Sequence, residues 1–547
     1  MNKFKFSYNA LLFFLIFITS CVDTNTINDW KKYDESFELK ENADHEIKRM
    51  RFKLIQSKFN DKNLWFNNLN NQLESFDEKQ YNRLAPIILE KDIPSIQKEI
   101  IVGNLTYEKL VKFYLYRIKK IEFNSNTYLN SIISINPKII DEAIEKDKSK
   151  PNSIYSMHGI PILLKDNINF EGLPTTAGAL VLKNNYTINS YVANKLEENG
   201  ALILGKTNLS EWAYYFCSGC PLGYSAIGGQ TLNPYGRKIF ESGGSSSGSG
   251  AAITANLSTV SLGSETSGSI LSPSSLNSIV GLKPTIGLVS RSGIVPISNS
   301  LDTSGPMTKN VIDNAIVFNN IMGFDSDDIF SKEKIDIDIS KIINSDLKGK
   351  KFGVFKSLID DPLYNEAIKS IQDAGGIIIE FTPPKIDFKG FRKILDVEMK
   401  RDIPKYLSQY SKLKNEIMNI NDIMNFNLDD SLNRSPYGQK LFEGIMNDKT
   451  KEEDFEKLKN RIMSEGKRYF DESIEKYSLD AILSINNYHA AYAAAAHYPC
   501  LTVPMGYKNS GLPANLTFIG PSMSENKLYQ YGFSYEKLTK KRIPPKL

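Results

Sequence analysis

The sequence predicts an α/β protein in which helices cover both faces of one large, mixed β-sheet. Two observations lead to this fold class. Short apolar runs of four or five residues recur along the chain, and stretches with apolar residues at helical spacing separate them. A length of 547 residues and a hydrophobic content of 41% are ordinary for a globular protein of this kind. We therefore expect one main domain preceded by an N-terminal helical segment.

The first alternating elements lie between residues 106 and 204. A helix is expected to begin after Thr106, because threonine is favoured at helix N-caps. Residues 160–164 then form a buried strand, 190–199 form a helix that Gly200 ends, and 201–204 form the next strand. This succession is typical of strands that lie in one sheet with helices across its faces.

The same alternation returns in the second half of the chain. Residues 352–355 and 377–379 read as strands on either side of a helix at 365–374, which makes a βαβ-like unit. The region from about 385 to 475 is charged, helical in pattern and without motifs. Three more strands are expected, at 480–483, 501–503 and 516–519.

The N-terminus has the composition of an export signal. Lys3 and Lys5 precede the apolar run 10–18, which is too short to span a membrane, and Thr-Ser-Cys follows. This ending resembles the lipobox of bacterial lipoproteins, so we expect residues 1–20 to be a signal peptide and Cys21 to carry the lipid. An ordinary cleaved signal is the alternative. The expected location is the periplasmic or cell-surface side of a bacterial membrane.

Residues 21–90 are expected to form a tether and an N-terminal helical segment. Residues 22–45 are polar and charged, as a tether would be. The stretch 46–75 is expected to be helical, because its apolar residues Met50 and Leu54 are spaced like one face of a helix.

Composition excludes several functional classes. Lys and Arg number 67 against 63 Asp and Glu, and no basic block stands out, so we expect no nucleic-acid partner. The four histidines do not lie at metal-ligand spacing with cysteines, so we expect neither a metal nor a cofactor. In an oxidising compartment Cys217 and Cys220 either pair or stay free, whereas Cys500 reads as a buried core residue.

Two Gly/Ser-rich loops are the most informative feature of the chain. One spans 241–250 and contains Ser245; the other spans 263–270 and contains Ser269, 24 residues further on. That separation accommodates a helix and a return strand, which brings both loops to one end of the sheet. Glycines let the backbone approach a ligand closely and present its N–H groups. A flexible linker is the alternative for the first loop, but both loops are embedded between apolar elements.

A lysine at the end of a predicted strand could act as the base for one of these serines. Serine is a weak nucleophile that needs a base, and a lysine with the ordinary pKa of ~10.4 is protonated. Lys165 ends the apolar strand 160–164, where burial would lower its pKa. A lysine that meets solvent at a strand end is the alternative. Together with the two loops, Lys165 predicts a serine hydrolase whose base is an amine.

These residues, in this order, resemble the amidase signature family, whose members are serine hydrolases of carboxamides. The similarity runs from about Ile93 to Pro545. The matching motifs are His158-Gly-Ile-Pro161, Gly205-Lys-Thr-Asn-Leu-Ser-Glu-Trp212, Gly229-Gln-Thr-Leu-Asn-Pro-Tyr235 and Val280-Gly-Leu-Lys-Pro-Thr285. Segments 208–212, 228–230 and 302–307 are most similar to the bacterial peptide amidases, which deamidate peptide C-termini.

The resemblance implies an amidase signature fold and a Ser-Ser-Lys triad. Lys165 matches the family's lysine, Ser245 its bridging serine in a cis peptide, and Ser269 its nucleophile. The implied reaction is hydrolysis of carboxamide C–N bonds through an acyl-enzyme, which releases ammonia or an amine from a small-molecule or peptide amide. We expect the backbone amides of Thr266, Ser267 and Gly268 to bind the oxyanion.

Three positions depart from the pattern of the amidase signature family. Ser247 and Ser267 stand where relatives have glycine or, at the second, aspartate, and Leu271 replaces an arginine.

The amidase domain is expected over 91–547, with 310–475 shaping the substrate pocket. An amidotransferase A subunit would need cytoplasmic partners and charged tRNA, which an exported lipoprotein lacks. A non-catalytic binding lipoprotein on an amidase scaffold is the third possibility.

Overall fold

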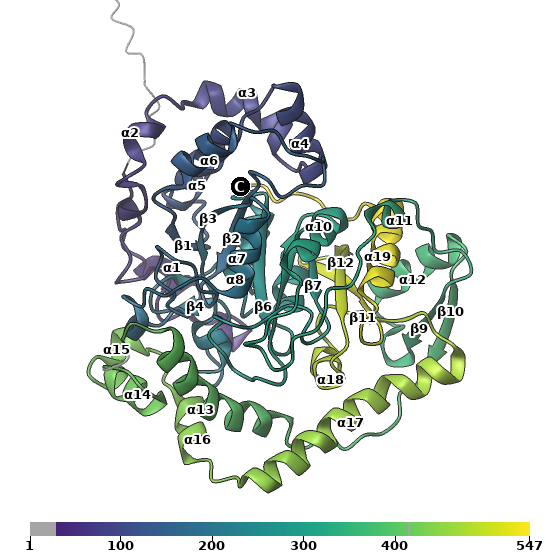
Figure 1. Ribbon diagram of the computed structural model, residues 1–547. Helices are drawn as coiled ribbons and strands as arrows, with labels where there is room; N and C mark the ends of the chain where they lie inside the picture. Colours follow the sequence, from purple (N-terminus) through teal and green to yellow (C-terminus); the bar gives the residue numbers. More distant parts are fainter. Residues whose placement is uncertain (1–28, 414–415) are drawn as a thin grey trace, which may run out of the picture.

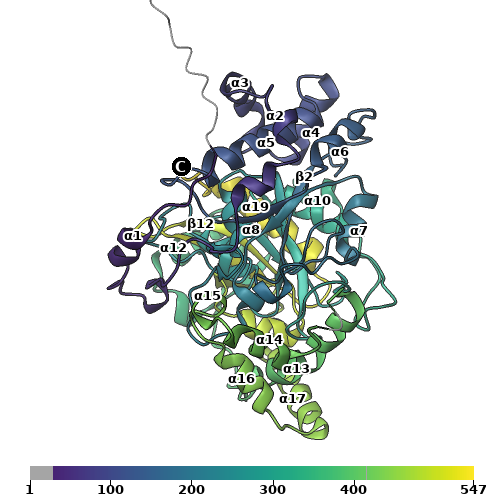
Figure 2. The same ribbon diagram turned by 90° about the vertical axis from the view of Figure 1, so that its left-hand side faces the viewer.

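The computed structural model describes residues 29–413 and 416–547, which are built around one mixed sheet of 11 strands (Figures 1 and 2). The strand order is β1-β3-β2-β6-β8-β7-β12-β13-β11-β9-β10. The strands are β1 (Ile132–Ile135), β2 (Pro161–Lys165), β3 (Leu202–Thr207), β6 (Val260–Glu265), β7 (Val280–Lys283), β8 (Thr303–Thr308), β9 (Lys351–Phe355), β10 (Ile377–Phe381), β11 (Ala481–Ile485), β12 (Cys500–Tyr507) and β13 (Pro513–Ile519). A separate hairpin joins β4 (Tyr224–Ser225) to β5 (Gly229–Gln230).

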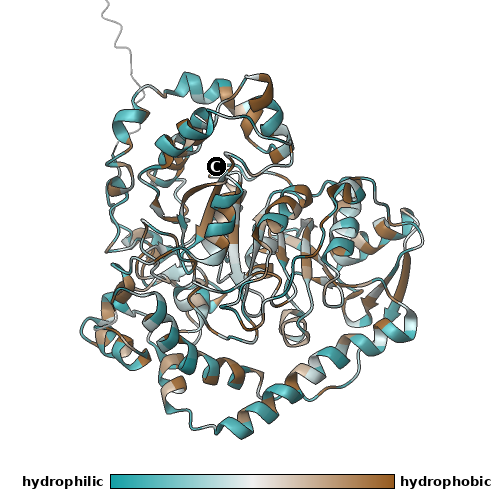
Figure 3. Ribbon diagram, in the orientation of Figure 1, coloured by the Kyte–Doolittle hydropathy of each residue, from teal (hydrophilic) through white to brown (hydrophobic). Residues whose placement is uncertain are grey.

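The sheet is mixed, and its central strands are covered on both sides. Strand β2 runs parallel to β3 and β6, and β9 runs parallel to β10 and β11, whereas the other pairs are antiparallel. Every residue of β2, β3 and β6 is buried, so neither face of these strands meets solvent. In Figure 3 hydrophobic residues are frequent along several strands near the centre, whereas the long outer helix of residues 452–477 is largely hydrophilic. The predicted fold class is confirmed.

Helices near the centre pack on these strands. Helix α8 (Ser247–Thr254) contacts β6, α9 (Leu271–Leu276) contacts β7 and β12, α10 (Val311–Ile321) contacts β8, and α19 (Glu525–Thr539) contacts β12. Further helices are α6 (Ile139–Lys146), α7 (Tyr191–Glu198), α11 (Ile339–Ile343), α12 (Pro362–Asp373) and α18 (Ala490–Ala496).

The elements expected from local signals form where the sequence places them. Helix α5 (Tyr107–Glu122) begins after Thr106, whose side chain accepts a hydrogen bond from the Lys109 N–H. Gly200, with φ of +81°, follows the end of α7 in the left-handed conformation that glycine adopts without strain. Strands β9 and β10 pair in parallel around α12, as the βαβ-like unit predicts.

The region expected to be helical between 385 and 475 forms a separate helical layer. It contains α13 (Phe391–Tyr410), α14 (Ile420–Leu428), α15 (Ser431–Arg434), α16 (Lys440–Asn447) and α17 (Glu452–Tyr477). Both views place these helices below the sheet (Figures 1 and 2). They share an apolar cluster with the chain at 212–220, in which Phe442 packs against Trp212 and Phe216.

The helix expected over 46–75 is a wrong prediction. That stretch holds only the short 3₁₀ turns Lys48–Met50 and Lys62–Phe66 and the four-residue α2 (Asn70–Leu73), and it is otherwise irregular. The backbone carbonyl of Ile55 accepts hydrogen bonds from the Gln230 N–H and the Asn130 side chain, at 2.8 and 3.0 Å. Because these tertiary contacts take the carbonyl that a helix would use internally, the apolar residues are buried by an extended chain instead.

The rest of the N-terminal segment packs on the domain. Helix α1 (Ser36–Glu41) lies within the stretch expected to be a tether, and the Asn42 side chain donates to the Met50 and Lys238 carbonyls. Helices α3 (Glu78–Ile88) and α4 (Ile93–Val102) follow. The predicted signal 1–20 and Cys21 lie outside the described residues. Among the residues described, no helix combines the length and apolar character that crossing a bilayer requires.

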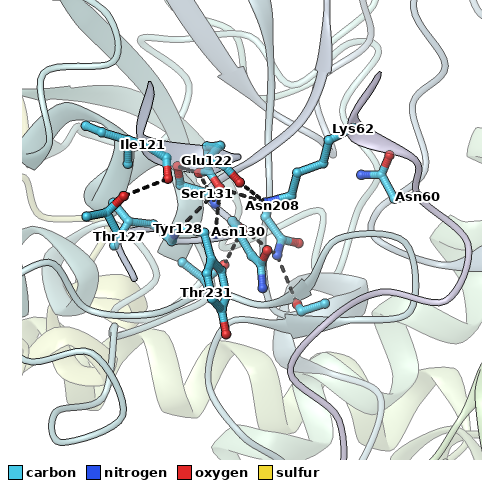
Figure 4. Close-up of polar contacts among 12 residues, drawn as sticks. Asn60, Lys62, Ile121, Glu122, Thr127, Tyr128, Asn130, Ser131, Asn208 and Thr231 are labelled. Carbon is cyan, nitrogen blue, oxygen red and sulfur yellow. Dashed lines mark hydrogen bonds and ion pairs between the residues drawn. The ribbon is translucent and has the colours of Figure 1, made fainter. Parts of the chain in front are cut away.

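A buried ion pair and the hydrogen bonds around it connect the N-terminal segment to the Gly/Ser-rich loop 241–250 (Figure 4). Lys62 lies 3.0 Å from Glu122, whose carboxylate also accepts hydrogen bonds from the N–H and hydroxyl of Ser131. The Ser131 carbonyl accepts from the Asn208 N–H, and the Asn208 carbonyl accepts from the Gly248 N–H. Polar contacts thus run from residue 62 to the start of α8, just beyond Ser245.

Candidate active site

Lys165 lies at the end of β2, fully buried, and contacts two serines. Its Nζ is 2.7 Å from Ser245 Oγ and 2.9 Å from Ser264 Oγ, and it donates to the Ser264 carbonyl at 3.1 Å. Strand β2 places the lysine there because β6, which carries Ser264, is its parallel neighbour. The side chain therefore points into the protein rather than to solvent, which rules out the strand-end alternative.

Burial sets the protonation of this amine. Removal from water disfavours the ammonium form and lowers the pKa of Lys165 from 10.5 to about 7. The carboxylates of Asp302 and Glu265 act in the opposite direction, because negative charge stabilises the ammonium. Near pH 7 the amine is thus present in both protonated and neutral forms, and the neutral form is a base.

The two Gly/Ser loops lie against each other, as expected. The Ser246 N–H donates to the Ser269 carbonyl at 3.1 Å, and the Ser246 hydroxyl donates to the Ser264 carbonyl at 3.1 Å. The peptide bond between Gly244 and Ser245 is cis. Ser245 is buried, whereas Ser269 is partly exposed. The structure thus groups Lys165 with one predicted serine and brings the loop of the other alongside.

The predicted set of oxyanion donors needs a correction. The buried carboxylate of Glu265 accepts hydrogen bonds from the N–H groups of Gly268, Ile270 and Leu271, at 2.7, 2.6 and 2.9 Å. The Gly268 N–H is therefore already used, because a buried carboxylate must be paired with donors. The other expected donors, the N–H groups of Thr266 and Ser267, have no hydrogen-bond partner in the part of the chain that the structure describes, and neither has that of Ser269.

A hollow of about 250 Å³, open solvent included, reaches Ser264, which Lys165 contacts. Asn167 and Ser264 line it, and the Asn167 side-chain amide donates to Ser264 Oγ at 2.9 Å. Asp302 lines it as well, and its carboxylate accepts from the Thr266 hydroxyl and from two backbone N–H groups. Burial raises the pKa of Asp302 to about 6. Sequence reasoning missed Ser264, Asn167 and Glu265, although each lies within five residues of a predicted site residue.

The departures from the family pattern are accommodated. The Ser247 hydroxyl donates to the Gly243 carbonyl at 2.5 Å at the first turn of α8. Leu271 is buried in an apolar cluster with Phe355.

Cys217 and Cys220, whose pairing the sequence left open, form a disulfide, and Cys500 is a buried free thiol.

Comparisons with known proteins agree with this geometry. The family profile described as Amidase matches residues 109–491. A probable amidase of Arabidopsis thaliana is 34% identical over 479 residues, which are 84% of this chain and 92% of the relative. An amidase family protein from Bacillus anthracis str. Ames superposes with a TM-score of 0.84 at 34% identity, covering 90% of this chain and all of that one. The peptide amidase from Stenotrophomonas maltophilia superposes with a TM-score of 0.77 at 33% identity, covering 84% of this chain and 99% of that one.

Proposed function

Because this chain belongs to the amidase signature family and is an amide-hydrolysing enzyme, we propose that Ser269 is its nucleophile, Ser245 its proton relay and Lys165 its base. The observation that carries this proposal is the 2.7 Å contact between the buried Lys165 amine and the Ser245 hydroxyl. A buried lysine without a carboxylate partner at hydrogen-bond distance is costly, and such a cost is typical of a functional group.

The three oxygens around Lys165 suit both the protonated and the neutral amine. A neutral amine has two N–H donors and one lone pair. When it is protonated, Lys165 donates to Ser245 Oγ and to the carbonyl and hydroxyl oxygens of Ser264; when it is neutral, it can keep the two bonds to Ser264 and accept from the Ser245 hydroxyl with its lone pair. That hydroxyl then donates its proton to Lys165 while it accepts the proton of Ser269.

The reaction follows from this arrangement. The deprotonated oxygen of Ser269 attacks the amide carbonyl, and the negative charge develops on the carbonyl oxygen. The N–H groups of Thr266, Ser267 and Ser269 are available to stabilise it. The C–N bond breaks as the relay returns its proton to the departing nitrogen, so ammonia or an amine leaves. Water, activated by the same lysine, then hydrolyses the ester on Ser269.

Peptide C-terminal amides are the proposed substrate class. The support is the similarity to the Stenotrophomonas peptide amidase, at 33% identity over most of both chains. Ammonia release across a panel of peptide amides, free amino-acid amides and fatty amides tests this choice. Faster release from fatty amides than from peptide amides would contradict it.

The triad is tested by substitution. Ser269→Ala and Lys165→Ala should each lower kcat by roughly 10⁴-fold or more, because the three groups act as one unit. Ser272→Ala, in the neighbouring helix α9, is the matched control and should stay within a few fold of wild type. Ser269→Ala should also abolish labelling by a fluorophosphonate. Unchanged labelling would exclude Ser269 as the nucleophile, and an unlabelled wild type would favour the binding-protein alternative.

Export and lipid anchoring at Cys21 are proposed from the sequence. The lipobox-like ending supports it, and the Cys217–Cys220 disulfide is typical of an oxidising compartment. Wild type should sediment with membranes and require detergent for release, whereas Cys21→Ala should appear in the soluble fraction. Equal distributions of the two proteins would contradict the anchor.

A further inference from the structure

A second hollow lies at the opposite end of β8 from the candidate active site. Thr303, the first residue of this strand, lines the hollow at Ser264, whereas Lys309, which follows its last residue, lines the second one. A strand rises ~3.3 Å per residue, so Thr303 and Lys309 are about 20 Å apart. The second hollow measures about 900 Å³ with open solvent included, and a water-sized group can be centred in about 370 Å³ of it. It therefore has room for a polyatomic ligand that stays away from Ser269.

The walls of this hollow come from segments that are distant in the sequence. Helices α10 and α19 pack side by side (Figure 1), and the residues before α10 and at the end of α19 face each other across it. Strand β12 and the chain just after α3 complete the walls. The tertiary fold thus assembles the hollow, and no local motif announces it.

The side chains that line the hollow carry more positive than negative charge. The basic ones are Lys309, Lys537, Lys540, Lys541 and Arg542, and the acidic ones are Glu90 and Glu536. Glu90 is engaged by Arg542, with which it pairs at 2.9 Å, and Lys541 pairs with Glu366. Burial raises the pKa of Glu536 to about 8, so this carboxyl is mostly uncharged at pH 7. Three lysines therefore remain to attract an anion.

Lys309 is the buried member of these three. It is 4% exposed, and its Nζ has no hydrogen-bond partner among the described residues. The carboxyl groups of Glu90 and Asp313 attract its charge, but burial outweighs them and lowers the pKa of the amine. A buried cation that lacks a hydrogen-bonded partner is destabilising, and the charge of an anion held in the hollow would offset part of that cost.

The other two lysines lie at the rim. Lys537 and Lys540 are exposed, one in the last turn of α19 and the other directly after it. The Lys537 amine is 5.8 Å from the centre of the Phe533 ring, which also lines the hollow. Two mobile ammonium groups above a third, buried one suit an anion with several oxygens and more than one charge. Phosphate has both properties, whereas a carboxylate offers two oxygens and a single charge.

We propose that this hollow binds a phosphate group, with Lys537 and Lys540 donating to its oxygens and Lys309 supplying positive charge at its base. The phosphate belongs either to a soluble ion or ester or to the headgroup of an anionic phospholipid, because the chemistry of recognition is the same for both. The site is separate from the proposed reaction, since about 20 Å of β8 lies between them.

Calorimetric titration of the full chain with inorganic phosphate, at constant ionic strength in chloride, is the first test. Wild type should bind with a Kd of about 1 mM or lower. Replacing two donors by Lys537→Gln together with Lys540→Gln should weaken binding about tenfold. The matched control is Lys449→Gln together with Lys451→Gln, two exposed lysines of the helical layer, and it should bind like wild type. Both double variants should release ammonia from amides at the wild-type rate.

Vesicles distinguish the two sources of the phosphate. The Cys21→Ala variant, which lacks the predicted lipid, is sedimented with vesicles of phosphatidylcholine alone and of phosphatidylcholine mixed with phosphatidylglycerol. A headgroup site predicts sedimentation with the mixed vesicles only, because their surface is anionic, and loss of it when Lys537 and Lys540 are replaced. A site for soluble phosphate predicts a calorimetric signal with inorganic phosphate and no sedimentation with either vesicle.

The proposal is overturned if neither inorganic phosphate nor the mixed vesicles bind. Binding that persists undiminished in the Lys537/Lys540 double variant would also overturn it. Lys309→Met tests the base of the hollow and should weaken the observed binding several-fold, whereas an unchanged affinity would contradict the proposal. If Lys309→Met fails to fold, the double variant still decides, because its substitutions lie at exposed positions.

Discussion

Amide hydrolysis should depend on pH through Lys165. With a pKa of about 7, roughly half of the lysine is neutral at pH 7 and about a tenth at pH 6. We expect kcat/KM to fall as the pH drops below 7, less steeply below pH 6 because Asp302 then loses its charge too, and to level off above pH 8. A lysine with its ordinary pKa of 10.5 would still be gaining activity at pH 9. Initial rates of ammonia release between pH 5 and 9 measure the profile.

A substitution of Asp302 tests whether nearby charge sets the pKa of Lys165. Its negative charge raises the pKa of Lys165, so Asp302→Asn should move the midpoint of the profile to lower pH. The pKa of Asp302 is itself about 6, so wild type loses this charge near pH 5 and the two profiles should converge there. A profile that is flat from pH 5 to 8, or a midpoint that rises in the variant, would refute the reasoning.

Because the pKa of Lys165 is lower in the folded protein than in the unfolded chain, the free energy of unfolding depends on pH. Between pH 7 and 10.5 the unfolded chain keeps the lysine proton that the folded chain has released. The free energy of unfolding therefore rises with pH in this window, by ~1.4 kcal/mol per unit. Below pH 7 the full cost of burying Lys165 is present, on the order of 5 kcal/mol, and above 10.5 it vanishes. Urea unfolding of wild type and Lys165→Met at pH 7 and 9 isolates this term: relative to the variant, wild type should gain about 2–3 kcal/mol.

Three further substitutions test the parts that hold the site in place. Lys62→Met leaves the Glu122 carboxylate buried and unpaired and should cost about 3–5 kcal/mol in urea unfolding, part of which the double variant with Glu122→Gln should recover. Thr106→Ala removes a helix cap and should cost about 1 kcal/mol by the same measurement, with activity unchanged. Gly248→Ala would place a Cβ 2.4 Å from the Asn208 carbonyl oxygen, so we expect a lower melting temperature by calorimetry and reduced kcat; wild-type values of both would contradict this packing.

The sequence predicted those parts of the protein whose signals are local. Glycine-rich loops, helix caps and apolar runs depend on a few neighbouring residues, so the strands around Lys165 and the loops of Ser245 and Ser269 were found correctly. The contact between Lys165 and Ser264 could not be found in this way. It depends on which strand lies beside β2, and only the complete sheet determines that.

The failures had the same origin. The residues at 46–75 have helical spacing, but the Ile55 carbonyl is bound by Gln230, which is 175 positions away. The Gly268 N–H was expected to face a substrate, but Glu265 reaches it across a turn. In both cases another acceptor or donor took a backbone group, from 175 positions away in the first case and from within the same loop in the second. Sequence spacing does not reveal such competition.

The course of the N-terminal segment bears on how this protein can be cut. Trp65, Phe66 and Leu69 belong to the same apolar core as the central strands. A shortened chain that starts at residue 91 would lose these side chains and expose the surface that they cover. It would also remove Lys62, the cation that pairs with Glu122. Glu122 is connected through Ser131 and Asn208 to α8, the helix that follows the loop of Ser245. Trimming for expression should therefore stop before residue 29, even though the amidase profile begins only at residue 109.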